Sequence, residues 1–285
     1  MSNIEVTSQL CLKLRPALFK VQLSPVGPSS YVVNAADLTA VTPGNGMCKY
    51  ADDTYLIIPA SNADSRVAEL DNVETWSRLN NLRLNRSKSA KIVFINSKRK
   101  CKSKFQSPPP IDGISRVTSL KILGVTITSS LSATEHVRQV LQSSAQTLYA
   151  LRILRSQGMN NTDLQTVYRS VVVSKLLYAS SAWIGFTTAA DRFRVEAFLR
   201  RSKRNGFCDA DLQSFEEHSK SADQKLFDKL LCNNNHVLSN LLPPQSVASQ
   251  NYSLRPRVHN RELPIYLTRL VNSNFVNRML FKDSY

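Results

Sequence analysis

The sequence predicts an α+β protein, in which a small β-rich part precedes a helical part and the boundary lies near residue 130. Two observations support this fold class. Between residues 47 and 128, short apolar runs alternate with turn residues, which is typical of strands. After residue 130, apolar residues instead recur at helical spacing over long stretches, which favours helices.

The clearest predicted strands form a hairpin. Met47–Ala51 is a short apolar run, and Tyr55–Ile58 is a second one that Pro59 closes. Asp52 and Asp53 lie between the two runs, so we expect a tight turn with both acids at the bend. The residues before the hairpin are punctuated by proline and glycine and show little pattern.

A helix and two further strands are expected after the hairpin. The helix spans Ala63–Leu84, and Asn62 is its expected cap. Lys91–Ile95 is a strand, and Leu120–Thr128 is another, which Gly124 breaks at a bulge or at a close approach of backbone. The apolar stripe of the helix comprises Val67, Leu70, Val73, Trp76 and Leu79.

The helical part contains three well-patterned helices and two weaker ones. Asn161 and Thr188 are the expected caps of the second and third helices. The sequence after residue 205 is more polar, and residues 243–262 are rich in proline and arginine. The expected helices are Ala133–Ser156, Thr162–Gly185, Ala189–Lys203, a helix around Lys225–Leu231, and Leu263–Phe281.

Charge is the strongest global property of the chain. Lysine and arginine number 37 and aspartate and glutamate number 21, which gives a net charge of +16. A surface this basic attracts polyanions and favours a nucleic-acid partner. An acidic protein partner or a membrane surface is the alternative.

The cysteines and the hydropathy predict an intracellular protein without a membrane span. The five cysteines are scattered and form no CxxC pair, which is typical of reduced thiols. The most apolar stretch, Val171–Phe186, is interrupted by Lys175 and is too short to cross a bilayer. We expect a location in the nucleus, the cytoplasm or both.

Asp52 and Asp53 form the sharpest candidate site. Two adjacent carboxylates repel each other and lose hydration in a hairpin, and a divalent cation offsets that cost. Mg²⁺ prefers oxygen ligands of this kind together with substrate phosphates, and Mn²⁺ is the alternative ion. An Asp-Asp pair by itself is more often a polar turn, so the flanking residues decide its interpretation.

A basic region follows the hairpin. Residues 75–111 contain no acid, and we expect their cations to follow the phosphates of a bound nucleic acid. A solvated loop is the alternative, and Lys98–Lys104 also resembles a nuclear localisation signal. The cations are Arg78, Arg83, Arg86, Lys88, Lys91, Lys98, Arg99, Lys100, Lys102 and Lys104.

A second group of cations lies at a predicted helix end. The helix dipole alone accounts for part of this group, and contact with a nucleic-acid duplex is the equal alternative. Four aromatic residues, Trp76, Trp183, Phe193 and Phe198, are expected in the core rather than in base stacking. The cations at the predicted helix end are Arg192, Arg194, Arg200, Arg201, Lys203 and Arg204.

Several segments, in this order, resemble motifs of LINE-type (non-LTR) retrotransposon reverse transcriptases. Tyr50-Ala51-Asp52-Asp53-Thr54 between apolar strands is similar to motif C of that family. The resemblance covers residues 22–285 and implies the C-terminal part of such an enzyme. The other segments are Gln22–Pro28 (motif B), Trp76-Ser77 with Asn81–Asn85 and Lys88 (motif D), Leu120–Val125 (leading to the primer grip), Ala133–Lys203 (thumb) and Leu254–Pro264 (far C-terminal segment).

The resemblance implies roles for single residues. Asp52 and Asp53 match the metal-binding pair, and Lys88 matches a lysine that can protonate the pyrophosphate leaving group. It also implies an RNA template, a DNA primer and a deoxynucleoside triphosphate as partners, with Mg²⁺ as the cofactor. The residues that match positions shaping the template and nucleotide pocket are Gln22, Ser24 and Gly27.

Two departures from the family weaken the implied activity. Leu23 stands where the family has glycine, and a bulky side chain there obstructs close approach of the backbone. The family's motif A supplies a further metal-binding aspartate upstream, whereas Glu5 is the only acid before residue 22. A two-metal site that lacks one carboxylate loses most of its rate, unless another chain supplies the missing strand.

The resemblance divides the chain into an atypical segment (residues 1–21), a partial palm (22–130), a helical thumb-like region (131–205) and a C-terminal extension (206–285). We expect the chain to bind template and primer but to polymerise weakly or not at all. One alternative is a non-enzymatic nucleic-acid-binding remnant or a domesticated retroelement protein. The other is a basic interaction protein in which the Asp-Asp turn is only structural.

Overall fold

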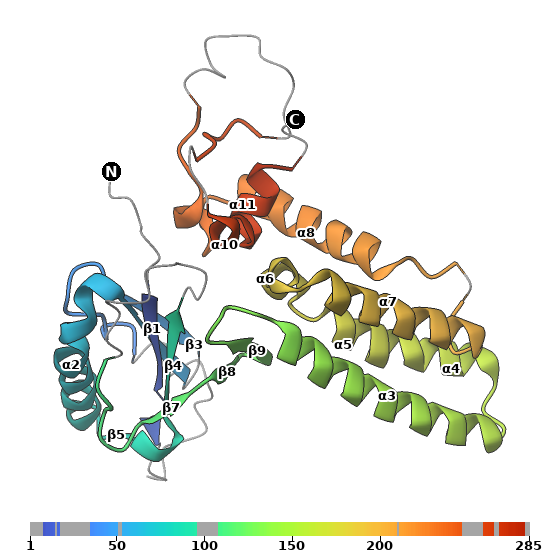
Figure 1. Ribbon diagram of the computed structural model, residues 1–285, viewed down its shortest axis with the longest axis horizontal. Helices are drawn as coiled ribbons and strands as arrows, with labels where there is room; N and C mark the ends of the chain where they lie inside the picture. The colour runs from blue at the N-terminus through green and yellow to red at the C-terminus, as the bar shows by residue number, and fades with distance from the viewer. Residues whose placement is uncertain are drawn as a thin grey trace. The chain divides into compact units, whose positions relative to one another are not determined.

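A computed structural model of the chain shows a mixed α+β protein, as the sequence predicts (Figure 1). The structure describes residues 8–14, 16–17, 35–50, 53–95, 108–209, 211–246, 259–264 and 268–282. The chain forms two compact units. The first comprises Met1–Ile122 and Thr126–Leu131, and the second comprises Leu123–Val125 and Ser132–Tyr285.

The first unit is built on a five-stranded sheet with the strand order β3-β4-β1-β6-β7. β1 pairs antiparallel with β4 on one side and with β6 on the other, whereas β6 and β7 are parallel. A second, shorter pairing joins β2 (Pro16–Ala17) to β5 (Arg83–Leu84). The strands of the larger sheet are β1 (Ser8–Leu14), β3 (Gly46–Tyr50), β4 (Asp53–Pro59), β6 (Ala90–Ile95) and β7 (Ser115–Val117).

The predicted hairpin is confirmed by β3 and β4, and the predicted strand at Lys91–Ile95 by β6. Alternation along β4 divides its side chains between two apolar clusters. Leu56 and Ile58 pack with the helix α2 (Arg66–Leu79), and Tyr55 packs with Ile92 on β6. β4 is therefore buried on both faces, which fixes the register of the hairpin.

α2 is shorter than the predicted helix at both ends. A 3₁₀ turn, Ala60–Ser65, precedes it, and Asn62 within that turn donates to the carbonyl oxygen of Pro43 (2.9 Å) instead of capping a helix. The predicted stripe is correct at its centre and wrong at its ends. Val67 is 59% exposed and Leu79 is 79% exposed.

A buried carboxylate explains why the predicted stripe fails. Glu69 is fully buried in α2 and accepts hydrogen bonds from the backbone nitrogens of Val41 (3.1 Å) and Thr42 (2.8 Å) and from Nδ2 of Asn45 (2.8 Å). Burial raises the pKa of Glu69, but these hydrogen bonds outweigh burial and hold that pKa below its usual value. Glu69 thus attaches the segment before the hairpin to α2.

The predicted strand Leu120–Thr128 is a hairpin, formed by β8 (Ser119–Ile122) and β9 (Val125–Thr128). Leu123 (φ 44°) and Gly124 (φ 89°) make the turn, which is why glycine interrupts the apolar run. In the second unit, the hydroxyl of Tyr178 donates to the carbonyl oxygen of Leu123 (3.0 Å). A Cβ on Gly124 would lie 3.1 Å from the Tyr178 ring, so the expected close approach is also present.

The second unit is helical, with α3, α7 and α8 packed side by side (Figure 1). Thr188 caps α7 as predicted, whereas Asn160 rather than Asn161 caps α4. The long helices are α3 (Thr134–Ser156), α7 (Ala189–Arg204) and α8 (Phe215–Cys232), and the short ones are α4 (Asn161–Val167), α5 (Ser174–Leu177), α6 (Ser180–Trp183), α10 (Arg269–Asn272) and α11 (Phe275–Leu280).

α3 and α7 run parallel and are connected at both ends. Near their N-termini, the hydroxyl of Thr134 donates to Oδ2 of Asp191 (2.7 Å). Near their C-termini, the guanidinium of Arg155 donates to the carbonyl oxygens of Asn205 (2.8 Å) and Gly206 (3.1 Å). Asp191 also closes a capping box with Thr188, so one buried carboxylate fixes where α7 begins.

The prediction of one continuous helix from Thr162 to Gly185 is wrong. α4 passes into a π-helical turn, Tyr168–Val173, and the left-handed conformation of Ala179 (φ 49°) separates α5 from α6. Gly185 follows α6 against the C-terminal segment. A Cβ there would lie 1.8 Å from the carbonyl oxygen of Ser273, so only glycine fits without a shift of backbone.

The C-terminal helices also differ from prediction. α8 is longer than the predicted Lys225–Leu231 helix, because Ser214 begins it with a capping box. α10 and α11 replace the single predicted helix Leu263–Phe281, since Thr268 and Asn274 each cap a new start. An ion pair between Arg278 of α11 and Asp223 of α8 (2.6 Å) holds these helices together.

Candidate functional site

The acidic hairpin is the first candidate site. Asp53 is the first residue of β4, paired with Tyr50 of β3, and its Oδ2 accepts a hydrogen bond from the hydroxyl of Tyr55 (3.0 Å). Asp52 lies outside the described residues. Among the described residues, no cluster of three or more His, Cys, Asp or Glu side chains is arranged to hold a metal. The Mg²⁺ site at Asp52 and Asp53 therefore stays a prediction.

The strand beside the hairpin contributes no carboxylate. β1 aligns Leu14 with Thr54 and Lys13 with Tyr55, so its C-terminal end lies next to the start of β4. The sequence of β1, SQLCLKL, contains no acid. Adjacent strands are the natural source of a further metal ligand, because facing residues on paired strands lie about 5 Å apart. A further carboxylate for a metal at the hairpin would therefore have to come from an element other than β1.

Several residues of the expected site lie where the structure is not described. These include Gln22, Ser24 and Gly27, which the resemblance assigns to the nucleotide pocket. Five basic residues of the expected phosphate-binding region also lie outside the described residues: Lys98, Arg99, Lys100, Lys102 and Lys104. Lys88 is described: it is exposed in the 3₁₀ turn Arg86–Lys88, where its backbone nitrogen donates to Oδ1 of Asn85 (3.0 Å).

Lys91 corrects the expected phosphate-binding face. Its side chain is only 1% exposed in β6, and Nζ donates to the carbonyl oxygen of Pro109 (2.8 Å). Burial, together with the positive charges of Arg66 and Arg116, lowers the pKa of Lys91 to about 8. β6 is buried on both faces, so strand alternation does not bring this lysine to the surface. Lys91 is therefore not part of a surface that a nucleic acid contacts.

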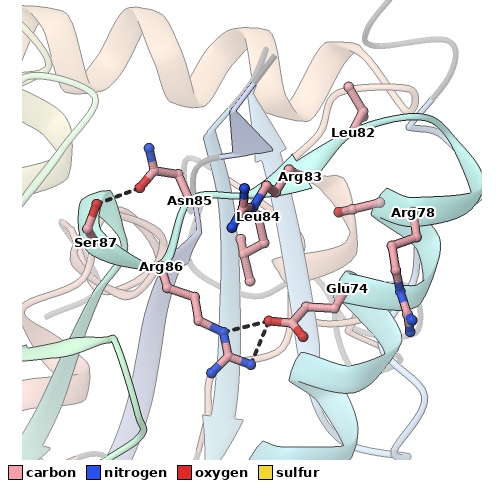
Figure 2. A pocket seen from close by; sticks show the side chains of 9 residues that line it. Glu74, Arg78, Leu82, Arg83, Leu84, Asn85, Arg86 and Ser87 are labelled. Atoms are coloured by element: carbon pink, nitrogen blue, oxygen red, sulfur yellow. Dashed lines mark hydrogen bonds and ion pairs between the residues drawn. The ribbon is translucent and has the colours of Figure 1, made fainter. Parts of the chain in front are cut away.

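Three arginines of the basic region do come together, around a pocket of about 890 Å³ in the first unit (Figure 2). α2 forms one side of the pocket, and β5 with the 3₁₀ turn after it forms the other (Figure 2). The sequence pattern identifies the arginines but not the pocket. The lining residues are Glu74, Ser77, Arg78, Leu82, Arg83, Leu84, Asn85, Arg86 and Ser87.

The three arginines differ in how they are bonded. Oε1 of Glu74 accepts from both Nε and Nη2 of Arg86 (2.6 Å each), and this contact raises the pKa of Arg86 (Figure 2). Nη1 of Arg86 donates to the carbonyl oxygen of Asp112 (3.1 Å). By contrast, Arg78 and Arg83 are exposed, and among the described residues neither forms an ion pair. The hydroxyl of Thr75, 3.2 Å away, is a neutral partner of Arg78.

α7 bears the second candidate surface. Arg200, Arg201 and Arg204 are exposed on one side of the helix, together with Phe193. Lys203 is excluded from this group, because its Nζ donates to the carbonyl oxygen of Leu212 (2.5 Å). Arg192 and Arg194 are also occupied locally, by Thr187 (3.2 Å) and Asp191 (2.5 Å). We call Phe193, Arg200, Arg201 and Arg204 the α7 stripe.

Phe193 corrects a second expectation. Trp76, Trp183 and Phe198 are buried as predicted, but Phe193 is 63% exposed. The guanidinium carbon of Arg200 lies 5.3 Å from the centre of its ring, within the range of a cation–π contact. The signal is present in the sequence, because Arg200 and Arg204 lie about two and three turns after Phe193 on the polar side of α7.

The comparisons with known proteins add no relative. No family model matches the sequence, and no curated protein matches it. Within the described helices, none is long and apolar enough to cross a membrane.

Proposed function

We propose that this chain is the C-terminal part of a LINE-type reverse transcriptase that binds nucleic acid but lacks a complete catalytic site. The Tyr50–Thr54 hairpin is the observation on which the proposal depends. β4 lies inside the five-stranded sheet and β3 pairs with it at the edge, and Asp53 of the Tyr-Ala-Asp-Asp sequence is the first residue of β4. A sheet supports a rigid carboxylate pair better than a surface loop does.

Polymerisation would need the acids of this hairpin to hold Mg²⁺ or Mn²⁺. The metal would activate the attacking 3′ oxygen and neutralise the phosphates of the nucleotide. Asp52 and Asp53 are oxygen donors of the right kind, but β1 adds none. Lys88, exposed after β5, is the proposed proton donor to pyrophosphate. Weak or absent synthesis is therefore part of the proposal, and a second chain carrying an acidic strand is the route to rescue.

Binding of a template and primer is the function that the α7 stripe supports. Exposed arginines without acidic partners attract phosphates, and an exposed aromatic ring stacks on a base. The stripe contains three such arginines and one such ring on one side of a single helix. The proposed partners are an RNA template and a DNA primer, in the nucleus or the cytoplasm.

A non-enzymatic nucleic-acid-binding protein is the second candidate. The acid-free sequence of β1 beside the hairpin favours it over an active polymerase. The two candidates share the α7 stripe and differ only in what the hairpin does. Both differ from a basic protein-interaction module, which would not bind an RNA–DNA hybrid in a salt-dependent way.

Binding of an RNA–DNA hybrid tests the shared part of the proposal. We expect fluorescence anisotropy to show binding that weakens as salt rises. Phe193→Ala should lower affinity by about 1 to 3 kcal/mol, the range for loss of one stacked base. Phe198→Leu, a conservative change in the core, is the control and should leave affinity unchanged. Binding that depends on neither salt nor Phe193 would contradict the proposal.

A further inference from the structure

We propose that the pocket between α2 and β5 is a phosphate-binding site for a nucleotide or a nucleotide chain, with Arg78 and Arg83 as its anion ligands. That the phosphate belongs to a nucleotide rests on the proposed function. That the pocket takes a phosphate rests on its own charge, size and construction.

The charge of the pocket favours an anion. Its lining residues include three arginines and one acid, Glu74. Glu74 is engaged by Arg86, so the positive charges of Arg78 and Arg83 are not neutralised by any described lining residue. Arginine binds phosphate oxygens through paired N–H groups, which gives both strength and geometry. An anion between these two side chains would restore neutrality.

The size of the pocket favours more than an inorganic ion. Its volume of about 890 Å³ falls within the range of roughly 300–1,000 Å³ for small-molecule sites. Leu82 and Leu84 add apolar surface beside the arginines (Figure 2). A nucleotide has a charged end for the arginines and a flat apolar base for the leucines. This combination fits the lining better than a bare phosphate ion does.

Backbone hydrogen bonds and strand pairing hold the segments that line the pocket. α2 ends at a tight turn in which Asn81 is left-handed (φ 54°) and the backbone nitrogen of Leu82 donates to the carbonyl oxygen of Ser77 (2.7 Å). Arg83 follows immediately in β5, where backbone pairing to Ala17 holds it. On the other side, Asn85 accepts from the hydroxyl of Ser87 (2.8 Å). The backbone of Arg83 is therefore held by strand pairing, and only its side chain needs to move when a phosphate binds.

The carboxylate of Glu74 would compete with a bound phosphate for the guanidinium of Arg86. It is the only acid among the lining residues, and it occupies Arg86 with a single oxygen. A phosphate that entered beside Arg83 would compete with Glu74 for the Arg86 guanidinium. Removal of the Glu74 charge should therefore tighten phosphate binding, because a third guanidinium would become available.

Calorimetric titration of the full chain with adenosine 5′-monophosphate tests the assignment. We expect the double variant Arg78→Gln, Arg83→Gln to bind this nucleotide at least about tenfold more weakly. The matched control is Arg192→Gln, Arg194→Gln, which removes two positive charges outside the α7 stripe, at side chains that already contact Thr187 and Asp191, and should change affinity by less than about twofold. If the parent chain binds the nucleotide, equal weakening by both pairs, or by neither, would overturn the proposal.

Three further titrations identify what is recognised. Adenosine without phosphate should not bind, and binding as tight as that of the monophosphate would count against a phosphate site. A short oligoribonucleotide with a 5′ hydroxyl distinguishes the two sources: if Arg78 and Arg83 matter for it and the monophosphate does not bind, the ligand is a backbone phosphate. Glu74→Gln should bind the monophosphate several-fold more tightly, and weaker binding would refute its role as competitor.

Failure of the pocket is distinguishable from failure of the proposed function. Hybrid binding through the α7 stripe does not require the pocket. Loss of nucleotide binding in both arginine pairs alike, with hybrid binding intact, would therefore reject the pocket and leave the proposed function standing.

Discussion

The pocket in the first unit and the α7 stripe in the second use the same residue type in opposite ways. The charge is the same: residues 1–131 contain 17 basic and 9 acidic residues and residues 132–285 contain 20 and 12, so each is +8. In the pocket, three arginines line one cavity together with a competing carboxylate. On α7, they follow one side of a helix, where none of the three stripe arginines forms an ion pair with a described residue. The pocket suits a small phosphate ligand, whereas the stripe suits an extended polymer.

The largest expected effect is a loss of stability in the second unit, which contains the α7 stripe but not the pocket. Gly185→Ala should destabilise the second unit by about 3 kcal/mol or more, because the new Cβ would overlap the carbonyl oxygen of Ser273. Urea unfolding followed by circular dichroism measures it. Gly158→Ala is the control: its φ is positive (92°), but no atom lies within 4 Å of the added Cβ, so this change adds backbone strain without a steric overlap. Equal destabilisation by the two variants would contradict the steric account.

A smaller effect is expected from the start of α7. Asp191→Ala should cost about 2 to 4 kcal/mol, because it removes a buried cap and leaves Thr134, Thr188 and Arg194 without their acceptor. Burial raises the pKa of Asp191, but hydrogen bonds from Thr188 and Thr134 outweigh burial and lower it. The stabilisation is therefore complete above the unfolded pKa and is lost as pH falls through the lower folded pKa. The variant should lose less stability than the parent chain as pH falls below the unfolded aspartate pKa of about 3.9.

Lys91 predicts a pH dependence of the same sign for the first unit, but in an alkaline window. Its folded pKa of about 8 lies below the ordinary lysine value of 10.5, so the unfolded chain binds more protons between these values. Stability should therefore rise as pH rises through this window, by on the order of 1 to 3 kcal/mol. Lys91→Met should remove that rise while fitting the same buried position. A parent chain whose first unit becomes less stable as pH rises above about 8 would contradict this assignment.

The smallest effect concerns salt. Arg200→Gln, Arg201→Gln should reduce the slope of log affinity against log salt for an RNA–DNA hybrid by about 2, because each arginine would neutralise one phosphate. Arg192→Gln, Arg194→Gln is the matched control, since these arginines already contact Thr187 and Asp191. If both pairs change the slope equally, α7 contributes only diffuse charge and the stripe is not a defined binding surface.

The sequence predicts the local elements with clear signals and misses those that tertiary contacts decide. The hairpin at Met47–Ile58 and the capped start of α7 at Thr188 follow from pattern and turn chemistry, and the structure confirms both. The kink at Ala179 has no such signal, because alanine favours a continuing helix. The burial of Glu69 has none either, since its partners lie more than twenty residues away along the chain.

The candidate sites show the same division. Charge alone identifies Arg78, Arg83 and Arg86, but only the fold shows that Glu74 occupies Arg86. Lys91 is expected at the surface because lysine is rarely buried, and the two-sided burial of β6 overrides that tendency. Asp52 and Lys98 lie outside the described residues, so their assignments remain predictions.

The central claim is that the chain binds a template–primer hybrid but does not catalyse DNA synthesis, and primer extension tests it most directly. The purified chain would be saturated with an RNA template and a DNA primer, then given deoxynucleotides with Mg²⁺ or Mn²⁺, beside an Asp52→Ala, Asp53→Ala control. We predict a bound hybrid and no extension in either protein, because β1 offers the hairpin no further carboxylate. Extension by the parent chain that disappears in the control would show a complete active site and contradict this account.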